Sequence, residues 1–384
     1  MRVAIVTWTF FSEQLELWRA CREEAVDIFM IGSAREYERS WQEWPWQGGL
    51  PNDFDGIELT PVGPFRRRGP LWWWYPGLAR ALRSFRPDVV HVISEPWGCR
   101  VIDSLVFARN ARRGAPVCAH GCENIYRQGS AMEQRARNVV LNATLQHLGG
   151  FVSWNEAGIE QARESGLPAE VPTTIIPAVV PDPSRFTPVA GGKRSELRRR
   201  LGLPLDRIVL GFLGRLVPEK GAADLIAALA ALEDHAPYLA VWGHGPDAPL
   251  LETYASGSRG VVRPSLPLHE VADALAACDI VAVPSRTTPD WAEQFGRVVV
   301  EGMLSGCVVV AYDSGALPEV VGDGGLIVQE GDIGELSKSI DDLATNGFLR
   351  DAISRRGRER ALSLYSPAAL APRMLDFWHE VAER

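Results

Sequence analysis

The stretch 284–303 places two carboxylates beside a strand end and a helix start, and it could bind a ligand that carries both an anion and hydroxyl groups. It follows the apolar run 279–283, which is typical of a buried strand, and its end has the pattern of a starting helix. Open α/β sheets bind ligands beyond the carboxyl ends of their strands, and a helix N-terminus attracts anions. Glu293 in the loop and Glu301 inside the helix flank this anion site, and their carboxylates suit the hydroxyl groups of a sugar.

A second loop, 214–221, has residue types that bind phosphate. It follows a predicted strand and is bounded by glycines, which allow the backbone to approach a ligand closely. Arg215 offers a bidentate fork and Lys220 a compact charge, and both suit phosphate oxygens. The loop lacks the Gly-Lys-Ser/Thr ending of a Walker loop, and the alternative is a surface loop with solvated charges. Gly243 and Gly245 end the next strand in a similar way, so three strand ends carry candidate ligand loops.

Apolar runs alternate with segments of helical period along nearly the whole chain. The predicted strands are 3–7, 26–31, 89–93, 117–119, 151–154, 174–176, 207–212, 239–242, 261–262, 280–283, 308–311 and 326–328. This alternation predicts an α/β fold with parallel sheets covered by helices on both faces. A proline-rich break at 177–192 separates an expected domain over 1–184 from a second over 185–366. A predicted helix over 367–383 either caps the second domain or crosses back to the first.

Length, charge and cysteine usage limit the class of protein. A chain of 384 residues exceeds one ordinary domain, and its formal net charge of −8 argues against general nucleic-acid binding. No apolar run approaches the length of a membrane span, and the N-terminus lacks a signal peptide's pattern, so we expect a cytoplasmic protein. Cys118, His120 and Cys122 invite a metal interpretation, but their spacing is not a common zinc pattern and we predict no metal.

In their order and residue types, the loops resemble motifs of retaining nucleotide-sugar glycosyltransferases of the GT-B fold, family 4 type (glycosyl transferases group 1). That family carries a Gly-Arg-Leu…Glu-Lys-Gly loop, a Gly-x-Gly-Pro turn, and Glu-x-Phe-Gly with a second glutamate eight positions after the first. The corresponding segments here are 214–221, 243–246, 293–296 with Glu301, and, further along, 314–321 and 325–328. The resemblance is close over 207–330 and weak in the N-terminal half. It implies two Rossmann-like doubly wound domains facing a cleft, with the C-terminal helix returning to the N-terminal domain.

The resemblance also implies a donor site for a nucleoside diphosphate sugar. Arg215 and Lys220 would hold the diphosphate and neutralise the leaving group, so no metal or other cofactor would be needed. Glu301 would bind the ribose, and Glu293 would touch the transferred sugar. The donor-binding residues implied are Gly214, Arg215, Lys220, Gly243, Gly245, Phe295, Gly296, Arg297, Val298 and Glu301, with backbone N–H groups of 297–299 completing the phosphate site.

The N-terminal half is expected to bind the acceptor. His120, at a predicted strand end, is implied to be catalytic by orienting the reactants, and the alternative is a satisfied histidine beside a turn. The predicted acceptor-binding residues are Trp8, Phe10, Phe11, Glu123, Asn124 and Ser153. The first three stand where similar enzymes often have a glycine pair, so an acceptor could stack on them. A second departure is Pro177-Ala178-Val179 in place of a common Pro-Asn-Gly segment.

The implied reaction is transfer of a sugar to a hydroxyl acceptor with retention of anomeric configuration. A UDP-sugar is favoured as donor over a GDP-sugar, and the acceptor class stays open among lipid-linked saccharides, polysaccharides and small natural products. The alternatives are a nucleotide-sugar epimerase on the same fold, or a binding protein without catalysis. The region 41–75 combines tryptophans with Arg66, Arg67 and Arg68, which suits peripheral contact with the inner membrane face, sugar stacking or core packing.

Overall fold

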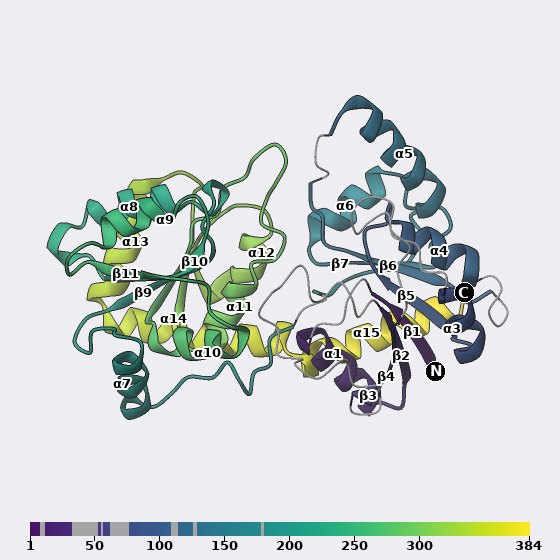
Figure 1. Ribbon diagram of the computed structural model, residues 1–384, viewed down its shortest axis with the longest axis horizontal. Coiled ribbons are helices and arrows are strands. Elements are labelled where there is room, and N and C mark those ends of the chain that lie inside the picture. The colour runs from purple at the N-terminus through teal and green to yellow at the C-terminus, as the bar shows by residue number, and fades with distance from the viewer. Residues whose placement is uncertain are drawn as a thin grey trace. The chain divides into compact units, whose positions relative to one another are not determined.

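A computed structural model describes residues 1–7, 12–32, 53–54, 57–61, 77–108, 114–125, 129–177 and 180–384. The described chain divides into two compact units (Figure 1). Residues 1–180 together with 367–384 form the N-terminal unit, and residues 181–366 form the C-terminal unit. The division at 180/181 lies four residues before the predicted boundary, within the same proline-rich segment. The tryptophan- and arginine-rich region 41–75 lies largely outside the described residues.

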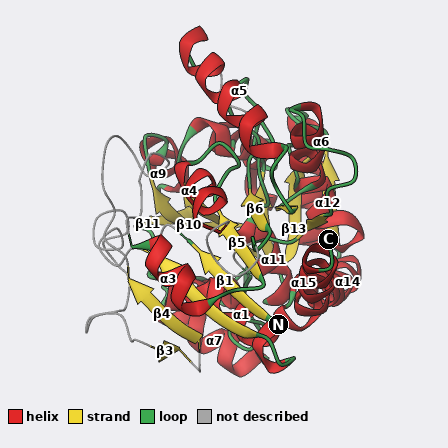
Figure 2. Cartoon of the chain, turned by 90° about the vertical axis from the view of Figure 1, so that its right-hand side faces the viewer, coloured by secondary structure: helices red, strands yellow, loops and turns green. Residues whose placement is uncertain are grey.

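The N-terminal unit is built on an eight-stranded sheet with the order β3-β4-β2-β1-β5-β6-β7-β8 (Figure 2). All neighbouring strands are parallel except β3 and β4. The strands are β1 (Arg2–Val6), β2 (Asp27–Gly32), β3 (Asp53–Phe54), β4 (Ile57–Pro61), β5 (Val89–Ile93), β6 (Val117–Gly121), β7 (Gly150–Ser153) and β8 (Thr173–Ile175). The helices are α1 (Ser12–Glu23), α3 (Leu78–Phe85), α4 (Cys99–Ala108), α5 (Ala131–Leu145), α6 (Glu156–Glu164) and α15 (Pro367–Ala382). The sequence analysis did not predict the edge strand β3 or its neighbour β4, and both lie within the tryptophan- and arginine-rich region 41–75.

Helix α15 packs in the N-terminal unit although its residues are the last in the sequence. Its apolar stripe, which includes Leu370, Met374 and Phe377, joins a core cluster with α1 and β1. Trp378 stacks on Trp18 of α1 with ring centroids 5.9 Å apart. The apolar area that α15 buries in this cluster is what holds the chain end to the N-terminal unit.

The C-terminal unit has a six-stranded, all-parallel sheet with the order β11-β10-β9-β12-β13-β14. The strands are β9 (Val209–Arg215), β10 (Tyr238–His244), β11 (Gly260–Arg263), β12 (Ile280–Val283), β13 (Val308–Tyr312) and β14 (Gly325–Val328). The helices are α7 (Gly191–Arg200), α8 (Ala222–Ala230), α9 (Ala248–Ala255), α10 (Leu268–Ala277), α11 (Arg297–Leu304), α12 (Leu317–Val321), α13 (Ile333–Thr345) and α14 (Gly347–Tyr365), with 3-10 turns at Pro218–Lys220, Glu233–His235 and Gly322–Gly324. The predicted α/β class with parallel sheets is confirmed in both units.

The strand order of the C-terminal sheet fixes where a ligand would bind. Strand β9 has β10 on one side and β12 on the other, so the direction of winding reverses between β9 and β12. The crevice beyond the carboxyl ends of the strands at such a reversal is where open α/β sheets bind ligands. The loops that follow β9 and β12 are 216–221 and 284–296, which contain the predicted phosphate-binding lysine and the first of the two predicted glutamates.

Candidate functional site

The side chains of Lys220 and Glu293 meet at the reversal point of the C-terminal sheet. The Lys220 Nζ lies 2.5 Å from the Glu293 Oε2, and the two side chains are 22% and 10% exposed. The hydroxyl of Ser285 donates to the same carboxylate oxygen over 3.0 Å. An ammonium and a carboxylate that are both largely removed from water attract each other strongly, so each fixes the position of the other.

The loops after β9 and β12 are held together by their backbones. Gly221 has φ +73°, and a Cβ at this position would lie 1.8 Å from the carbonyl oxygen of Pro284. Only glycine allows so close an approach in this backbone conformation. The backbone N–H of Arg286 donates to the carbonyl of Glu219 over 2.8 Å, and its guanidinium pairs with Asp224 on α8. The lysine and the glutamate are therefore brought together by the path of the main chain.

Trp291 is a third member of this cluster, although the sequence analysis assigned it no role. The Lys220 Nζ lies 4.8 Å from the centroid of its ring, within the range of a cation–π interaction. The side chain is half-buried. A tryptophan two residues before Glu293 was a signal in the sequence, but only the fold shows that it faces the lysine.

The loop that carries Glu293 is anchored to the core on its far side. The backbone carbonyl of Glu293 accepts from the N–H of Ala316 over 2.8 Å. Phe295 is buried and packs edge-on against Tyr365 with ring centroids 5.5 Å apart. Phe295 was predicted among the donor-binding residues; its ring lies in the core, where it anchors the loop.

Glu301 lies in the second turn of α11 and is buried. Its Oε1 pairs with the Nε of Arg297, one helical turn earlier, over 2.9 Å. Burial raises the pKa of the Glu301 carboxyl, and the charges of Arg297 and Arg185 partly oppose that rise. Gly296 precedes the helix and Val298 follows its first residue, so the predicted residues 296–298 form the N-terminal turn of α11. The N–H of Val299 donates to the carbonyl of Gly296, which removes it from the expected phosphate-binding set.

Two family profiles match the chain. The one described as Glycosyl transferases group 1 matches residues 193–360, and the one described as Glycosyl transferase 4-like domain matches residues 12–178. A D-inositol 3-phosphate glycosyltransferase of Actinosynnema mirum is 35% identical over 330 residues, covering 78% of this chain and 74% of that protein. The chain belongs to the glycosyl transferases group 1 family. The family recognised from the motifs is thus confirmed.

Other relatives match this chain over shorter stretches. A D-inositol 3-phosphate glycosyltransferase of Stackebrandtia nassauensis is 36% identical over 205 residues, which are 49% of this chain and 44% of that protein. A GDP-mannose-dependent alpha-(1-6)-phosphatidylinositol monomannoside mannosyltransferase of Mycolicibacterium smegmatis is 35% identical over 196 residues. These residues are 47% of this chain and 50% of that protein. The chain therefore spans about half the length of these two relatives.

Solved structures share the fold of this chain over its whole length. Sucrose-phosphate synthase from Thermosynechococcus elongatus superposes with a TM-score of 0.73 at 18% identity, over 99% of both chains. The Anabaena protein HepE in complex with UDP superposes with a TM-score of 0.72 at 19% identity, over 98% of this chain and 99% of that one. The predicted GT-B fold is thereby confirmed.

The remaining donor residues predicted for this family member lie at the ends of β9 and β10. Arg215 is exposed, and its guanidinium lies 3.9 Å from the Glu219 carboxylate. Gly214 precedes it and borders open space. A Cβ at Gly243 would lie 2.1 Å from the Gly214 carbonyl oxygen, so this glycine lets β10 pass close to β9. Gly245 makes a similar approach to the backbone that follows β9.

His120, which was predicted to orient the reactants, points into the core of the N-terminal unit. It is buried, and its Nδ1 and Nε2 lie 2.9 Å from His91 Nε2 and 2.7 Å from the Ile176 carbonyl oxygen. The indole N–H of Trp378 donates to His91 Nδ1 over 3.1 Å, so His91 donates to His120, which donates to the carbonyl. Burial lowers the pKa of His120 to about 4. Both nitrogens of a neutral His120 are thus engaged inside the N-terminal unit, which corrects its predicted placement and favours the alternative of a satisfied histidine.

The predicted acceptor residues differ in accessibility. Glu123 and Asn124 are half-buried just after β6, and Glu123 accepts from the indole of Trp97 over 3.3 Å. Ser153 is fully buried and its hydroxyl accepts from the N–H of Asn155, so its predicted acceptor contact is corrected. Trp8, Phe10 and Phe11 lie outside the described residues.

Sequence reasoning missed Glu95, which orders the chain around Glu123. Glu95 follows β5 and is buried, and its Oε1 accepts from the backbone N–H groups of Cys122 and Glu123 over 2.7 and 3.1 Å. Burial raises the pKa of the Glu95 carboxyl, and these hydrogen bonds oppose the rise. Its position directly after a predicted strand was the available signal, since ligand-edge residues of parallel sheets occur there.

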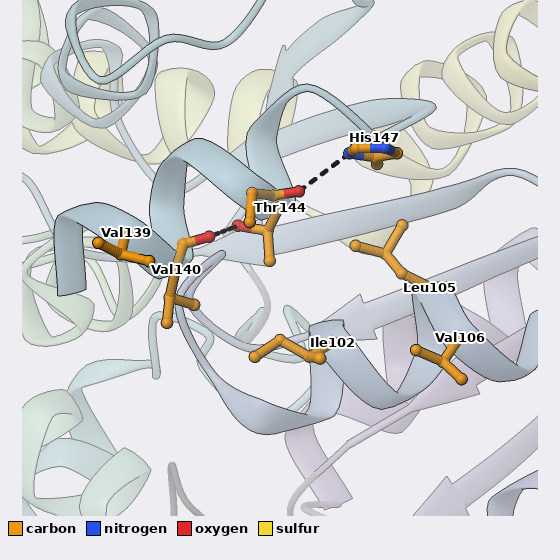
Figure 3. A pocket seen from close by; sticks show the side chains of 8 residues that line it. Ile102, Leu105, Val106, Val139, Val140, Thr144 and His147 are labelled. Atoms are coloured by element: carbon orange, nitrogen blue, oxygen red, sulfur yellow. Dashed lines mark hydrogen bonds between the residues drawn. The ribbon is translucent and has the colours of Figure 1, made fainter. Parts of the chain in front are cut away.

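Three further observations concern the described residues. An open apolar groove of roughly 290 Å³ runs between α4 and α5 and is lined by Leu105, Val106, Val139 and Val140 among others (Figure 3). It contains none of the predicted site residues. In the described parts of the chain, no group of three metal-ligating side chains is positioned to hold an ion, and no helix is long and apolar enough to cross a bilayer.

Proposed function

We propose that this glycosyltransferase moves a sugar from a nucleoside diphosphate sugar to a hydroxyl acceptor with retention at the anomeric carbon. The observation that carries the proposal is the Lys220–Glu293 pair at the reversal point of the C-terminal sheet. The pair places a cation that suits a diphosphate next to a carboxylate that suits sugar hydroxyls, so one ligand could contact both. A site for phosphate alone would not need the carboxylate, and a site for sugar alone would not need the cation.

In the proposed reaction, the bond between the anomeric carbon and the diphosphate oxygen breaks while the acceptor oxygen attacks from the same face. Negative charge grows on the departing diphosphate, and the ammonium of Lys220 and the guanidinium of Arg215 stabilise it without a metal. By analogy with oxyanion-hole deletions, each such donor contributes about 2.7–4 kcal/mol to transition-state stabilisation. The departing phosphate acts as the base and takes the acceptor proton. Because the acceptor oxygen is itself the nucleophile, the proposed reaction needs no covalent nucleophile from the chain.

Glu301 and α11 are proposed to receive the nucleoside part of the donor. Glu301 is held by Arg297 on the first turn of the helix, and its carboxylate suits the two ribose hydroxyls. The helix N-terminus adds backbone N–H groups for the diphosphate. We propose a UDP-sugar as the donor, with a GDP-sugar as the second candidate. One relative is named as GDP-mannose-dependent, and one structure with the same fold is described in complex with UDP.

A panel of UDP- and GDP-sugars in a thermal-shift assay tests donor binding, and mass spectrometry with lipid-linked, polysaccharide and small hydroxyl acceptors then tests transfer. Lys220→Ala and Arg215→Ala should each lower turnover by about 10²–10³-fold if both stabilise the leaving group. Near-wild-type turnover in both variants would overturn the assignment. Incubation with donor alone separates the alternatives, because an epimerase would release an isomeric nucleotide sugar and an inactive binding protein would leave the donor intact.

A further inference from the structure

The Lys220 ammonium has two neighbours of different kinds in this structure. One is the Glu293 carboxylate at 2.5 Å, and the other is the face of Trp291 at 4.8 Å from the ring centroid. In the proposed function, Glu293 must turn to the hydroxyl groups of the sugar while Lys220 turns to the diphosphate. The ion pair must therefore loosen when the donor binds, and the lysine would then lose the partner that orders its flexible stem.

The turn that carries Trp291 is rigid enough to keep the ring in place during this exchange. Thr288 and Trp291 close the turn with reciprocal backbone hydrogen bonds of 2.8 and 3.3 Å. At the base of the turn, the N–H of Thr287 donates to Glu330 over 2.9 Å, and its hydroxyl lies 2.9 Å from that of Ser314. These partners follow β13 and β14, so two neighbouring strand ends hold the backbone at the base of the turn that carries Trp291.

An aromatic face is a suitable partner for an ammonium that must also bind phosphate. The ring attracts the positive charge through its quadrupole and occupies only one side of the ammonium. The N–H groups on the other side stay available to phosphate oxygens. A carboxylate partner would instead compete with the phosphate for these N–H groups. A tryptophan face therefore orders Lys220 without neutralising the charge that the diphosphate needs.

We propose that Trp291 is a positioning residue that holds the Lys220 ammonium toward the donor diphosphate once the pair between Lys220 and Glu293 has opened. This inference rests on the proposed function and deepens it. According to this inference, the turn 287–291 affects the affinity for the diphosphate part of the donor. The turn itself makes no contact with the nucleoside. Its effect must therefore act through Lys220.

The test measures the dissociation constants of a nucleoside diphosphate and of the matching nucleoside by calorimetry. Trp291→Leu should weaken nucleoside diphosphate binding about tenfold, equivalent to about 1.4 kcal/mol. The dissociation constant of the matching nucleoside should stay within about twofold of the wild-type value. Trp291→Phe is the matched control, because it keeps an aromatic face and should restore most of the affinity. Trp291→Met is measured in parallel, so that the prediction can still be tested if Trp291→Leu does not fold.

A double-mutant cycle with Lys220→Met separates an indirect role from direct contact. In the Lys220→Met background, Trp291→Leu should cause no further loss of nucleoside diphosphate affinity. An equal loss in both backgrounds, or an equal loss for the nucleoside, would overturn the inference by showing direct contact between ring and ligand. Wild-type affinity in both apolar variants would overturn it as well. If the wild-type protein binds no nucleoside diphosphate, the proposed function fails and the inference fails with it.

Discussion

Replacing Lys220 with methionine removes the positive member of a pair whose other member is nearly buried. The Nζ–Oε2 distance is 2.5 Å, and the lysine and glutamate side chains are 22% and 10% exposed. Breaking a buried pair by removing one partner typically destabilises the fold by about 3–5 kcal/mol, because the remaining charge is left uncompensated. Lys220 is partly exposed and Ser285 still donates to Glu293, so we expect the lower end, about 3 kcal/mol.

Thermal unfolding checks this value. For a domain of this size, about 1 kcal/mol shifts the melting temperature by about 2–4 °C, so Lys220→Met should melt about 6–12 °C below wild type. The double variant Lys220→Met/Glu293→Gln removes both charges and should regain most of the lost stability, while its turnover stays as low as that of the single variant. A single variant that melts with wild type, or a double variant no more stable than the single, would refute the reasoning.

Three further predictions concern other parts of the structure. Because burial lowers the pKa of His120 to about 4, the unfolded chain binds a proton between pH 6.5 and 4 that the folded chain does not. The contribution of His120 to stability should therefore be full above pH 6.5 and fall by about 2 kcal/mol between pH 7 and 5, measured as the difference between wild type and His120→Gln in denaturant unfolding, because burial also lowers the pKa of His91. Glu301→Gln should raise the dissociation constant of a nucleoside diphosphate by about 10–100-fold, since a hydrogen bond to a charged group contributes about 1.5–3 kcal/mol; unchanged calorimetric affinity would exclude the ribose contact. Gly221→Ala should lower the melting temperature far more than Gly257→Ala, because the two positions have φ +73° and +76° but only the first has backbone within contact distance. Equal effects of the two alanines would show that the close approach costs nothing.

The motif-bearing loops of the C-terminal unit were predictable because each follows a largely apolar run that predicts a buried strand. Runs such as 308–312 are apolar without alternation, which is typical of parallel strands covered on both faces. The carboxyl ends of such strands share one edge, so residues 73 positions apart, such as Lys220 and Glu293, could be expected near one ligand. The pairing of Lys220 with Glu293 itself, and the ring of Trp291 beside them, depend on loop paths that no local pattern specifies.

The placements of His120 and Ser153 could not be predicted from the sequence for one shared reason. His120 and Ser153 end strands in the N-terminal sheet, and a strand end alone does not say whether a side chain points to solvent or to the core. Trp378 decides the matter for His120, because its indole fixes the tautomer of His91 and through it that of His120. Trp378 lies 258 positions after His120, and its proximity follows from the packing of α15 onto the N-terminal core.

The amino-acid sequence by itself determined the α/β class, the family, and the residue types that a nucleotide-sugar site needs. These follow from local periodicity and from motifs whose spacing is set by single loops. Only the tertiary structure decided which charges are paired, which histidine nitrogens are occupied, and which aromatic ring faces the lysine. Such contacts depend on burial and on distances between segments far apart in the chain, and the free energy of a charge or a hydrogen bond changes with both.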